Sequence, residues 1–296
     1  MPIFKIDNDK DEAKQIFSDI NYFESEAKLR DFFADNLGEL LGMRFLAKEY
    51  PTTDGRIDTL ALDENSSPVI IEYKWGEDNA VFVQGLFYFN WLKKNKKHFD
   101  LLVGDKFGKE EKVNWTNPRV ILIARGFDNR TISAVQQVNN VELIKYMPYK
   151  QNIIYLENVY SPNKVKHIKD TKENKKDVDK EPLNLEYHFN KKNSTKEIRD
   201  IFYKLQEKIK SLPDIEEFIN QKSGITYRTT MSFVRVEFGK TYIDVLLRGS
   251  KYNDPKKLVQ DVSTFKWGYS GRTKIKKEKD IEDIFDLVKQ SYQSTL

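Results

Sequence analysis

The sequence has 296 residues, and its 50 lysines and arginines against 46 aspartates and glutamates give a net charge of +4. This length suits two domains of ordinary size and excludes a single small module. The chain has no cysteine, which excludes a disulfide framework and a thiolate metal site and favours an intracellular setting. The basic excess is small beside the total charge, so it is only a weak hint of affinity for a polyanion.

The start of the chain shows no targeting signal. Residues 1–8 lack the apolar core of a signal peptide, and no run approaches the roughly 18 apolar residues that a membrane span needs. We therefore expect a soluble, cytoplasmic protein with no membrane partner. The three histidines, His98, His167 and His188, lie far apart and show no ligand spacing, which leaves carboxylates as the candidate metal ligands.

An amphipathic helix is predicted over residues 23–41, because its apolar residues recur at helical spacing with charges between them. Glu26 lies close to the apolar stripe of this helix, where an unpaired charge is costly. A structural explanation is that Ser25 caps the helix and that Glu26 interacts favourably with the helix dipole.

Three strands are predicted next. The first covers residues 44–50, and Glu49 near its end is either an outer metal ligand or an exposed strand-end glutamate. The other two cover residues 55–60 and 69–74. Residues 63–68 between them carry turn chemistry, so these two strands form a predicted hairpin.

The hairpin carries the most informative side chains of the chain. Because successive side chains of a strand alternate between faces, Glu72 and Lys74 are expected to share one face and the apolar residues beside them the other. With the side chain of Asp58 on that same face of the neighbouring strand, two carboxylates and one lysine converge. The alternative is a buried ion pair between Lys74 and one carboxylate, although such pairs stabilise a fold poorly compared with apolar packing.

Two carboxylates held close together repel each other, and their pKa values rise unless a cation lies between them. A hard divalent ion with oxygen ligands meets this need, and we expect Mg²⁺ (or Mn²⁺). A lysine beside such an ion can orient or help to deprotonate a water molecule and can stabilise negative charge on a phosphate. The trio therefore predicts hydrolysis of a phosphodiester bond.

The arrangement resembles the catalytic signature of the PD-(D/E)XK nuclease superfamily, carried here by Asp58 and by Glu72-Tyr73-Lys74. The place of the first acidic motif is taken by Gly55-Arg56-Ile57-Asp58. The proline and aspartate that name the superfamily are not kept as a pair, so only the acidic residue is carried over.

This resemblance implies a restriction-endonuclease-like α/β fold, in which a mixed sheet is flanked by helices. It implies that Asp58 and Glu72 are metal ligands and that Lys74 is the catalytic lysine. Glu26 matches the glutamate of the first helix that often joins the metal site in this superfamily. This role and the capping explanation both stay open. Arg56 is a candidate substrate contact.

A buried helix is predicted over residues 79–97, because apolar residues surround it on nearly every side. Gln84 and Tyr88 lie four residues apart on one face of it. The pair resembles the Gln-x-x-x-Tyr element that follows the lysine motif in the RecB-like branch of the superfamily, which implies that both residues help to position the DNA strand.

Further strands are predicted over residues 99–103, 119–124, 141–146 and 153–156, with a short helix over 129–140. The strand over 119–124 is continuously apolar, as expected for a central strand covered on both faces. These elements complete an α/β layer architecture, so we predict a nuclease-like domain over residues 1–160.

Residues 161–185 are rich in charged residues and asparagine and are predicted to be a flexible linker. A smaller α+β domain is predicted over residues 186–296, with helices over 194–211 and 281–292. Strands between these helices are predicted at residues 225–227, 232–238 and 242–247.

The C-terminal region resembles the DUF5655 domain family, which brings no settled activity. The resemblance is carried by Arg235-Val236, Tyr242-Ile243-Asp244-Val245, Trp267-Gly268-Tyr269 and Gln290-Ser291-Tyr292. Basic residues interleaved with aromatic residues here predict either a surface that stacks single-stranded nucleic acid or aromatic residues of the core. The residues concerned are Arg228, Arg235, Arg248, Arg272, Lys274, Lys276 and Lys277, with Tyr227, Phe233, Trp267 and Tyr269.

Two classes of function remain. The favoured one is a Mg²⁺-dependent nuclease whose partner is nucleic acid, with DNA preferred over RNA. The alternative is a non-catalytic nucleic-acid-binding or regulatory protein that retains the nuclease fold. A homodimer is left open.

Overall fold

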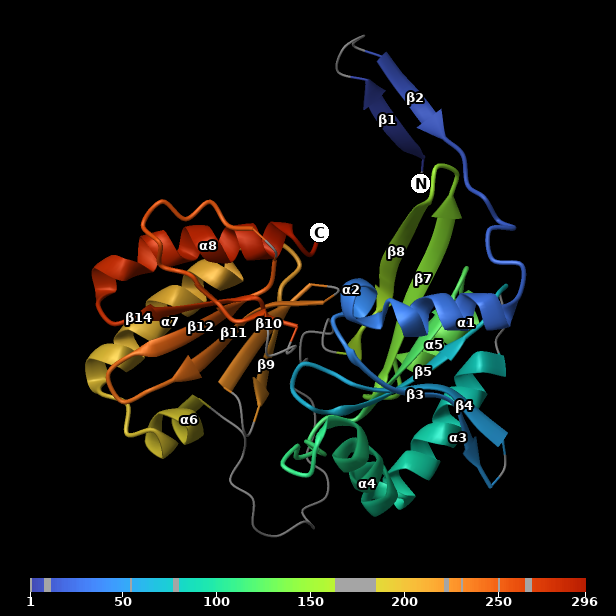
Figure 1. Cartoon of the computed structure of the whole chain (residues 1–296), viewed down its shortest axis with the longest axis horizontal. Coiled ribbons are helices and arrows are strands. Elements are labelled where there is room, and N and C mark those ends of the chain that lie inside the picture. Colours follow the sequence, from blue (N-terminus) through green and yellow to red (C-terminus); the bar gives the residue numbers. More distant parts are fainter. Residues whose placement is uncertain are drawn as a thin grey trace. The chain divides into compact units, whose positions relative to one another are not determined.

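The computed structural model in Figure 1 describes residues 2–7, 12–53, 55–76, 80–162, 185–220, 224–229, 231–249, 251–263 and 268–296. The chain divides into two compact units. Unit 1 comprises residues 1–40 and 45–165, and unit 2 comprises residues 41–44 and 166–296. Most of the predicted linker, residues 163–184, lies outside the described residues.

Unit 1 is built on a six-stranded mixed sheet with the order β3-β4-β5-β6-β7-β8. The pairs β4–β5 and β7–β8 are antiparallel, whereas β5–β6 and β6–β7 are parallel. Every residue of β5 and β6 is buried, since helices cover both faces of the centre of the sheet. The strands are β3 (Arg44–Thr52), β4 (Gly55–Leu62), β5 (Pro68–Tyr73), β6 (Arg119–Ala124), β7 (Val141–Tyr149) and β8 (Ile153–Tyr160).

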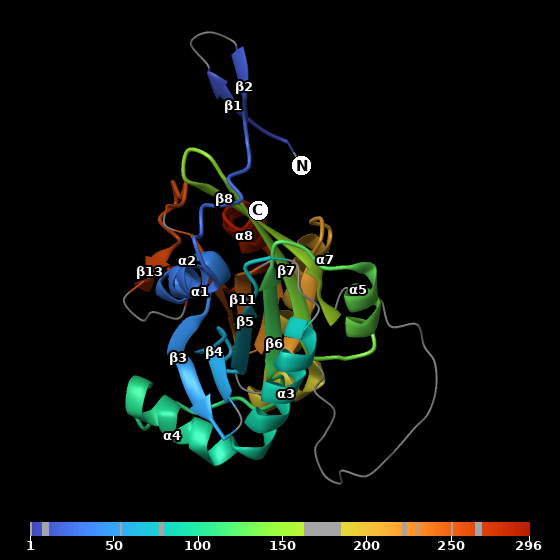
Figure 2. The same cartoon turned by 90° about the vertical axis from the view of Figure 1, so that its right-hand side faces the viewer.

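Helices lie on both faces of this sheet. On one face Tyr73 of β5 packs against Phe33 of α1, with ring centroids 5.6 Å apart. On the other face Glu72 accepts a hydrogen bond from Gln84 of α3, and α3 packs along β5 and β6 (Figure 2). The helices are α1 (Glu26–Asp35), α2 (Leu37–Leu41), α3 (Ala80–Lys94), α4 (Lys96–Phe107) and α5 (Asn129–Val135). The predicted mixed sheet flanked by helices is therefore confirmed.

The strand predicted over residues 99–103 is wrong, because this segment lies inside α4. Strand alternation would put Phe99, Leu101 and Val103 on one face. Phe99 and Val103 are fully buried, but Leu101 is 67 % exposed, so the segment follows a helical period.

Two predicted helices are shorter than expected. The helix predicted over residues 23–41 is divided at Asn36 into α1 and α2, and Asn36 donates its side-chain amide to the carbonyl of Phe32. The helix predicted over 79–97 ends at Lys94. Asn95 follows it as the N-cap of α4, so the last residues of the predicted helix belong to a new helix.

The sequence also gave no signal for the first two strands. β1 (Ile3–Asp7) and β2 (Glu12–Ile16) form an antiparallel pair. Its end is joined to β7, because Ser18 bridges Tyr149 and Asp19 donates its backbone N–H to the carbonyl of Pro148.

Unit 2 has an antiparallel sheet with the order β13-β14-β12-β11-β10-β9. The strands are β9 (Glu216–Asn220), β10 (Gly224–Arg228), β11 (Ser232–Phe238), β12 (Ile243–Leu247), β13 (Gln260–Asp261) and β14 (Gly271–Ile275). The helices are α6 (Leu185–Lys191), α7 (Lys196–Lys210) and α8 (Ile281–Gln293), with a short 3-10 turn, η3 (Glu278–Asp280), before α8. The apolar sides of α7 and α8 join the core with the inner residues of the strands. None of the described helices has the length and apolar character that crossing a membrane requires.

Candidate active site

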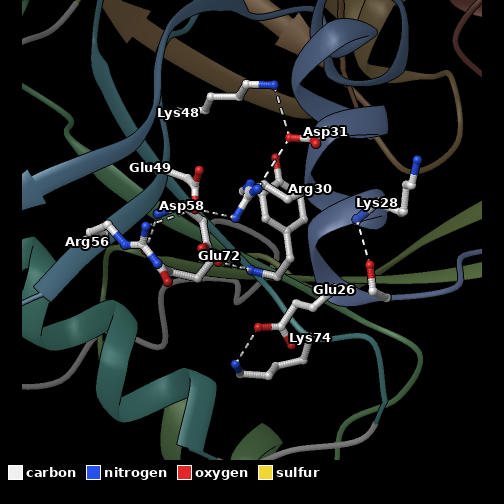
Figure 3. Close-up of polar contacts among 12 residues, drawn as sticks. Glu26, Lys28, Arg30, Asp31, Lys48, Glu49, Arg56, Asp58, Glu72 and Lys74 are labelled. Carbon is white, nitrogen blue, oxygen red and sulfur yellow. Dashed lines mark hydrogen bonds and ion pairs between the residues drawn. The ribbon is translucent and has the colours of Figure 1, made fainter.

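The two predicted acidic residues meet at the end of the β4–β5 ladder. The register pairs Thr59 with Ile71, which places Asp58 opposite Glu72. The backbone N–H of Asp58 donates to Glu72 Oε1 over 3.2 Å, and the N–H of Tyr73 donates to Asp58 Oδ2 over 3.1 Å. Each carboxylate is therefore held by the backbone of the neighbouring strand, which fixes both of them in position (Figure 3).

Burial dominates the electrostatics of this pair. Burial and, as the next largest cause, the negative charge of Asp58 raise the pKa of the fully buried Glu72 to about 9. Burial also raises the pKa of Asp58, and the charge of Glu26 adds to this, while Arg30 and Lys74 lower it. The site thus holds more carboxylate than its own cations compensate.

Lys74 follows directly after the last residue of β5, so strand alternation no longer fixes its direction. Its Nζ donates to Glu26 Oε1 over 2.9 Å, and the backbone N–H of Trp75 approaches the other oxygen of Glu26 at 3.4 Å. The lysine side chain is 18 % exposed and the glutamate side chain 43 %. The first turn of α1 and the end of β5 therefore meet through this ion pair.

The structure supports the capping explanation for Glu26, whereas its role as a metal ligand stays a prediction. Ser25 is the N-cap of α1, and its Oγ accepts from the N–H of Lys28 over 3.2 Å. Glu26 lies in the first turn, where a carboxylate also favours the helix dipole. The cap turns the start of the helix so that Glu26 reaches the lysine of the candidate site.

Gln84 and Tyr88 extend the site onto α3. Gln84 Nε2 donates to Glu72 Oε2 over 2.7 Å, and the Tyr88 hydroxyl accepts from the backbone N–H of Arg56 over 3.0 Å. Gly55 has a φ of +149°, and a Cβ at this residue would lie 2.5 Å from the Tyr88 hydroxyl. Only glycine permits this close approach, so β4 begins against α3.

Two further residues join the site. Arg30 of α1 donates from Nη1 to Glu49 Oε1 over 3.1 Å, and Arg56 Nη1 lies 3.2 Å from the same oxygen. The sequence did not single out Arg30. For Glu49 it left two roles open, an outer metal ligand or an exposed glutamate at the end of a strand. The available signal was that Arg30 lies four residues after Glu26, on the same side of the helix.

Asp58 and Glu72 are the residues of this site that could hold a metal ion. Among the described residues no group of three or more histidine, aspartate or glutamate side chains is placed to hold a metal, and Glu26 is paired with Lys74. Mg²⁺, however, usually keeps several waters and binds through one or two carboxylates together with substrate phosphates. The close pair Asp58 and Glu72, in which burial penalises both charges, fits that requirement.

The basic and aromatic set of unit 2 does not form the predicted stacking surface. Tyr227 and Phe233 are fully buried in the core, and Trp267 lies outside the described residues. Arg228 forms a buried ion pair with Glu216, with Nε and Oε2 2.9 Å apart. Arg235 and Arg248 both lie over the ring of Tyr269, which is itself buried, with 2 % exposed.

Comparison with known proteins gives a family match for unit 2 and a relative that spans most of the chain. Residues 186–295 match the family model described as "Domain of unknown function (DUF5655)", which confirms the resemblance predicted for the C-terminal region. An uncharacterized protein of Haemophilus influenzae (strain ATCC 51907 / DSM 11121 / KW20 / Rd) is 28 % identical over 284 residues, which is 91 % of this chain and 93 % of that protein.

Two solved structures are also similar to parts of the chain. One is an EndoMS–dsDNA2 complex, with 18 % identity and a TM-score of 0.27 over 40 % of this chain and 42 % of that one. The other is a repair endonuclease from Pyrococcus abyssi, with 20 % identity and a TM-score of 0.27 over 41 % of this chain and 46 % of that one. These likenesses are too partial to argue from, so the interpretation of the site depends on its own geometry.

Proposed function

We propose that this chain is a metal-dependent nuclease that hydrolyses phosphodiester bonds, with DNA as the favoured substrate. The observation that supports it most is the pair of Asp58 and Glu72, which face each other from adjacent strands close to Lys74. This arrangement agrees with the resemblance to the PD-(D/E)XK nucleases that the sequence carries.

Each residue has a distinct role in this proposal. Asp58 and Glu72 would hold Mg²⁺ or Mn²⁺, with Glu26 as a third candidate ligand, and the ion would neutralise phosphate charge and lower the pKa of a bound water. Lys74 places a compact ammonium where it can orient the attacking water or stabilise negative charge on the phosphate. Gln84 holds Glu72 through its amide and thereby fixes the direction of that carboxylate.

The preference for DNA derives from Gln84 and Tyr88. Their spacing resembles the element that positions DNA in the RecB-like branch of the superfamily, and both contact the candidate site, Gln84 at Glu72 and Tyr88 at the backbone of Arg56. Homodimer formation and the identity of the metal stay predictions.

A second function has one observation in its favour. The Lys74 ammonium is held by Glu26 at 2.9 Å, as in a structural ion pair. A protein that keeps this pair and binds nucleic acid without cutting it is the alternative, and a cleavage assay separates the two.

The test is cleavage of labelled single-stranded, duplex and branched DNA and of RNA, in Mg²⁺ or Mn²⁺ and in EDTA. We expect metal-dependent products from the wild type, and a loss of roughly 10²-fold to 10⁴-fold in rate for Asp58→Asn and for Lys74→Met. Asp35→Asn is the matched control, because Asp35 is an exposed carboxylate of the same unit. Circular dichroism confirms that each variant is folded.

Two results would contradict the nuclease assignment. Cleavage that persists in EDTA, or full activity in both site variants, would show that the activity has another source. Binding without cleavage of any substrate would favour the alternative function.

A further inference from the structure

A cluster of charges lies beside Asp58 and Glu72 and is not used in the roles described above. Glu49 Oε1 is shared by two guanidinium groups, Arg30 Nη1 at 3.1 Å and Arg56 Nη1 at 3.2 Å (Figure 3). Arg30 also approaches Asp31 at 3.4 Å, and Asp31 accepts from Lys48 Nζ over 3.0 Å. The chain of contacts contains three cations and two carboxylates, so it carries one excess positive charge.

The backbone of Glu49 is unusual for its position. Its φ is +49°, although it lies within β3 and is not glycine. A non-glycine residue in the left-handed region costs on the order of 1–3 kcal/mol and persists where the surroundings impose it. The turn at this residue directs its carboxylate between Arg30 and Arg56.

Arg30 and Arg56 differ in freedom. The Arg30 side chain is 13 % exposed, and its charge acts on Asp58, whose pKa it lowers against the larger effect of burial. Its Nε is buried and has no hydrogen-bond partner among the residues that the structure describes. The Arg56 side chain is 66 % exposed, so it can turn towards a ligand.

We infer that Arg30 and Arg56 form a phosphate-binding pair beside Asp58 and Glu72, and that Glu49 takes the place of a backbone phosphate of a polynucleotide in the free protein. This inference rests on the proposed function. It adds Arg30 as a substrate-binding residue beside Arg56, the substrate contact predicted from the sequence, and it adds a competing carboxylate. Arg30 supplies a fixed guanidinium, and Arg56 closes onto the phosphate from the surface.

The chemistry of the site explains why such a pair is needed. The negative charges of Asp58 and Glu26 repel an approaching phosphate. Guanidinium groups present parallel N–H donors that match the oxygens of a phosphate, and they remain charged at any physiological pH. An anionic side chain that already lies between two such groups competes with the phosphate, so its removal should strengthen binding rather than weaken it.

The test is fluorescence anisotropy of labelled single strands and duplexes with the full chain in EDTA, so that no cleavage occurs, at a series of NaCl concentrations. The variants are Arg30→Met and Arg56→Met, which keep an apolar stem, and Glu49→Gln, which keeps the shape of the side chain. Arg199→Met is the matched control, because Arg199 also bonds a carboxylate and an amide, those of Glu186 and Asn190, but lies in unit 2.

We expect each site arginine variant to weaken binding about five- to tenfold. Each should also reduce the slope of log K against log salt by about 0.9 for a duplex or about 0.7 for a single strand, as loss of one phosphate contact requires. Glu49→Gln should tighten binding by about threefold or more, because it removes a charge next to the phosphate. Arg199→Met should leave both quantities unchanged.

Several results would overturn the inference. An unchanged salt slope in Arg30→Met together with a lower melting temperature would assign Arg30 a purely structural role. Weaker binding by Glu49→Gln would show that Glu49 supports binding and does not compete with it. A wild type that binds none of the oligonucleotides would also overturn the inference.

The assay also separates this inference from the nuclease assignment. A protein that never cleaves but shows the expected slopes keeps the phosphate site and loses the enzymatic function. A metal-dependent nuclease whose slopes do not change in the arginine variants keeps its function and loses the phosphate site.

Discussion

Unit 1 contains two pairs of carboxylates that differ in the groups they contact: Asp63 and Glu142 are both buried, whereas in the other pair Glu72 is buried and Asp58 is partly buried. Asp63 and Glu142 are 2 % and 3 % exposed, and Arg119 of β6 pairs with both, with its Nε 3.1 Å from Glu142 Oε1. Asp58 and Glu72 also lie close together, but Glu72 accepts only from neutral amides in the contacts described above, those of the Asp58 backbone and Gln84.

Under the proposed function, the difference between the pairs separates a structural site from a functional one. Asp63 and Glu142 share Arg119, a cation that the protein itself supplies. The Asp58–Glu72 pair keeps a pKa of about 9 at Glu72, mainly because burial disfavours its charge. Under the proposed function, an external cation would supply the positive charge that this pair lacks.

The largest expected effect comes from breaking the compensated pair. Arg119→Met leaves two buried carboxylates without their cation, so we expect the free energy of unfolding to fall by about 3–5 kcal/mol. Urea denaturation measures it. Arg130→Met, at an exposed position of α5, should change stability by less than about 0.5 kcal/mol. A similarly small change in Arg119→Met would mean that the two pairs do not differ in the way described.

The pair of Asp58 and Glu72 should respond to added metal, which binds the folded chain and stabilises it. Mg²⁺ that binds the folded state at about 100 times its Kd raises the free energy of unfolding by about 2.7 kcal/mol. We expect this gain in the wild type and in Asp35→Asn, and its loss in Asp58→Asn and Glu72→Gln. KCl at equal ionic strength controls for screening. A gain that survives in both site variants would place the metal elsewhere.

The pH dependence of stability tests the same pair without metal. The folded pKa of Glu72, about 9, lies above its ordinary value of 4.5, so between these values the folded chain keeps a proton that the unfolded chain has released. Rising pH therefore lowers stability across this window, by up to about 1.4 kcal/mol per pH unit, and has no effect through Glu72 below about pH 4.5. Urea titrations in EDTA measure the slope.

Removing the charge of one glutamate from each pair should change the free energy of unfolding in opposite directions. Glu72→Gln removes the penalty and should raise stability at pH 8 by about 2 kcal/mol or more. Glu142→Gln removes a charge partner of Arg119 and should lower stability by about 2 kcal/mol. Loss of stability in Glu72→Gln at pH 8 would show that the Glu72 charge is already compensated in the folded chain.

The sequence predicted the parts of the fold whose residues carry a local pattern. The continuously apolar run of β6 identified a buried central strand of the sheet. Residues 99–103 were misread because an apolar run suits both a strand and a helix, and only burial distinguishes them. Residues 216–220 and 271–275 were missed because charged side chains interrupt their apolar pattern, and pairing with neighbouring strands is what makes them strands.

The candidate site shows the same limit. The spacing of Asp58 and Glu72 sufficed to predict that they meet, since the hairpin pairs their strands, whereas Lys74 lies beyond β5 and contacts Glu26. The contact between Arg30 and Glu49 joins residues 19 apart on a helix and a strand, and it depends on the φ of Glu49. A local sequence pattern predicts neither this contact nor the φ of Glu49, so the contact between the two residues is found only in the three-dimensional structure.

The smallest expected effect comes from converting the second pair into a copy of the first. Gln84→Lys puts an ammonium where an amide now donates to Glu72, so it should raise stability at pH 8 by about 1 kcal/mol and flatten the pH slope. It should also abolish the gain from Mg²⁺, because the protein then supplies its own cation. Gln84→Leu is the control, since it removes the amide without adding charge and should lower stability by about 1 kcal/mol while the gain from Mg²⁺ remains. If Gln84→Lys kept the full response to Mg²⁺, the absence of a protein cation would not be what prepares Asp58 and Glu72 for a metal, and the contrast with Asp63 and Glu142 would lose its functional meaning.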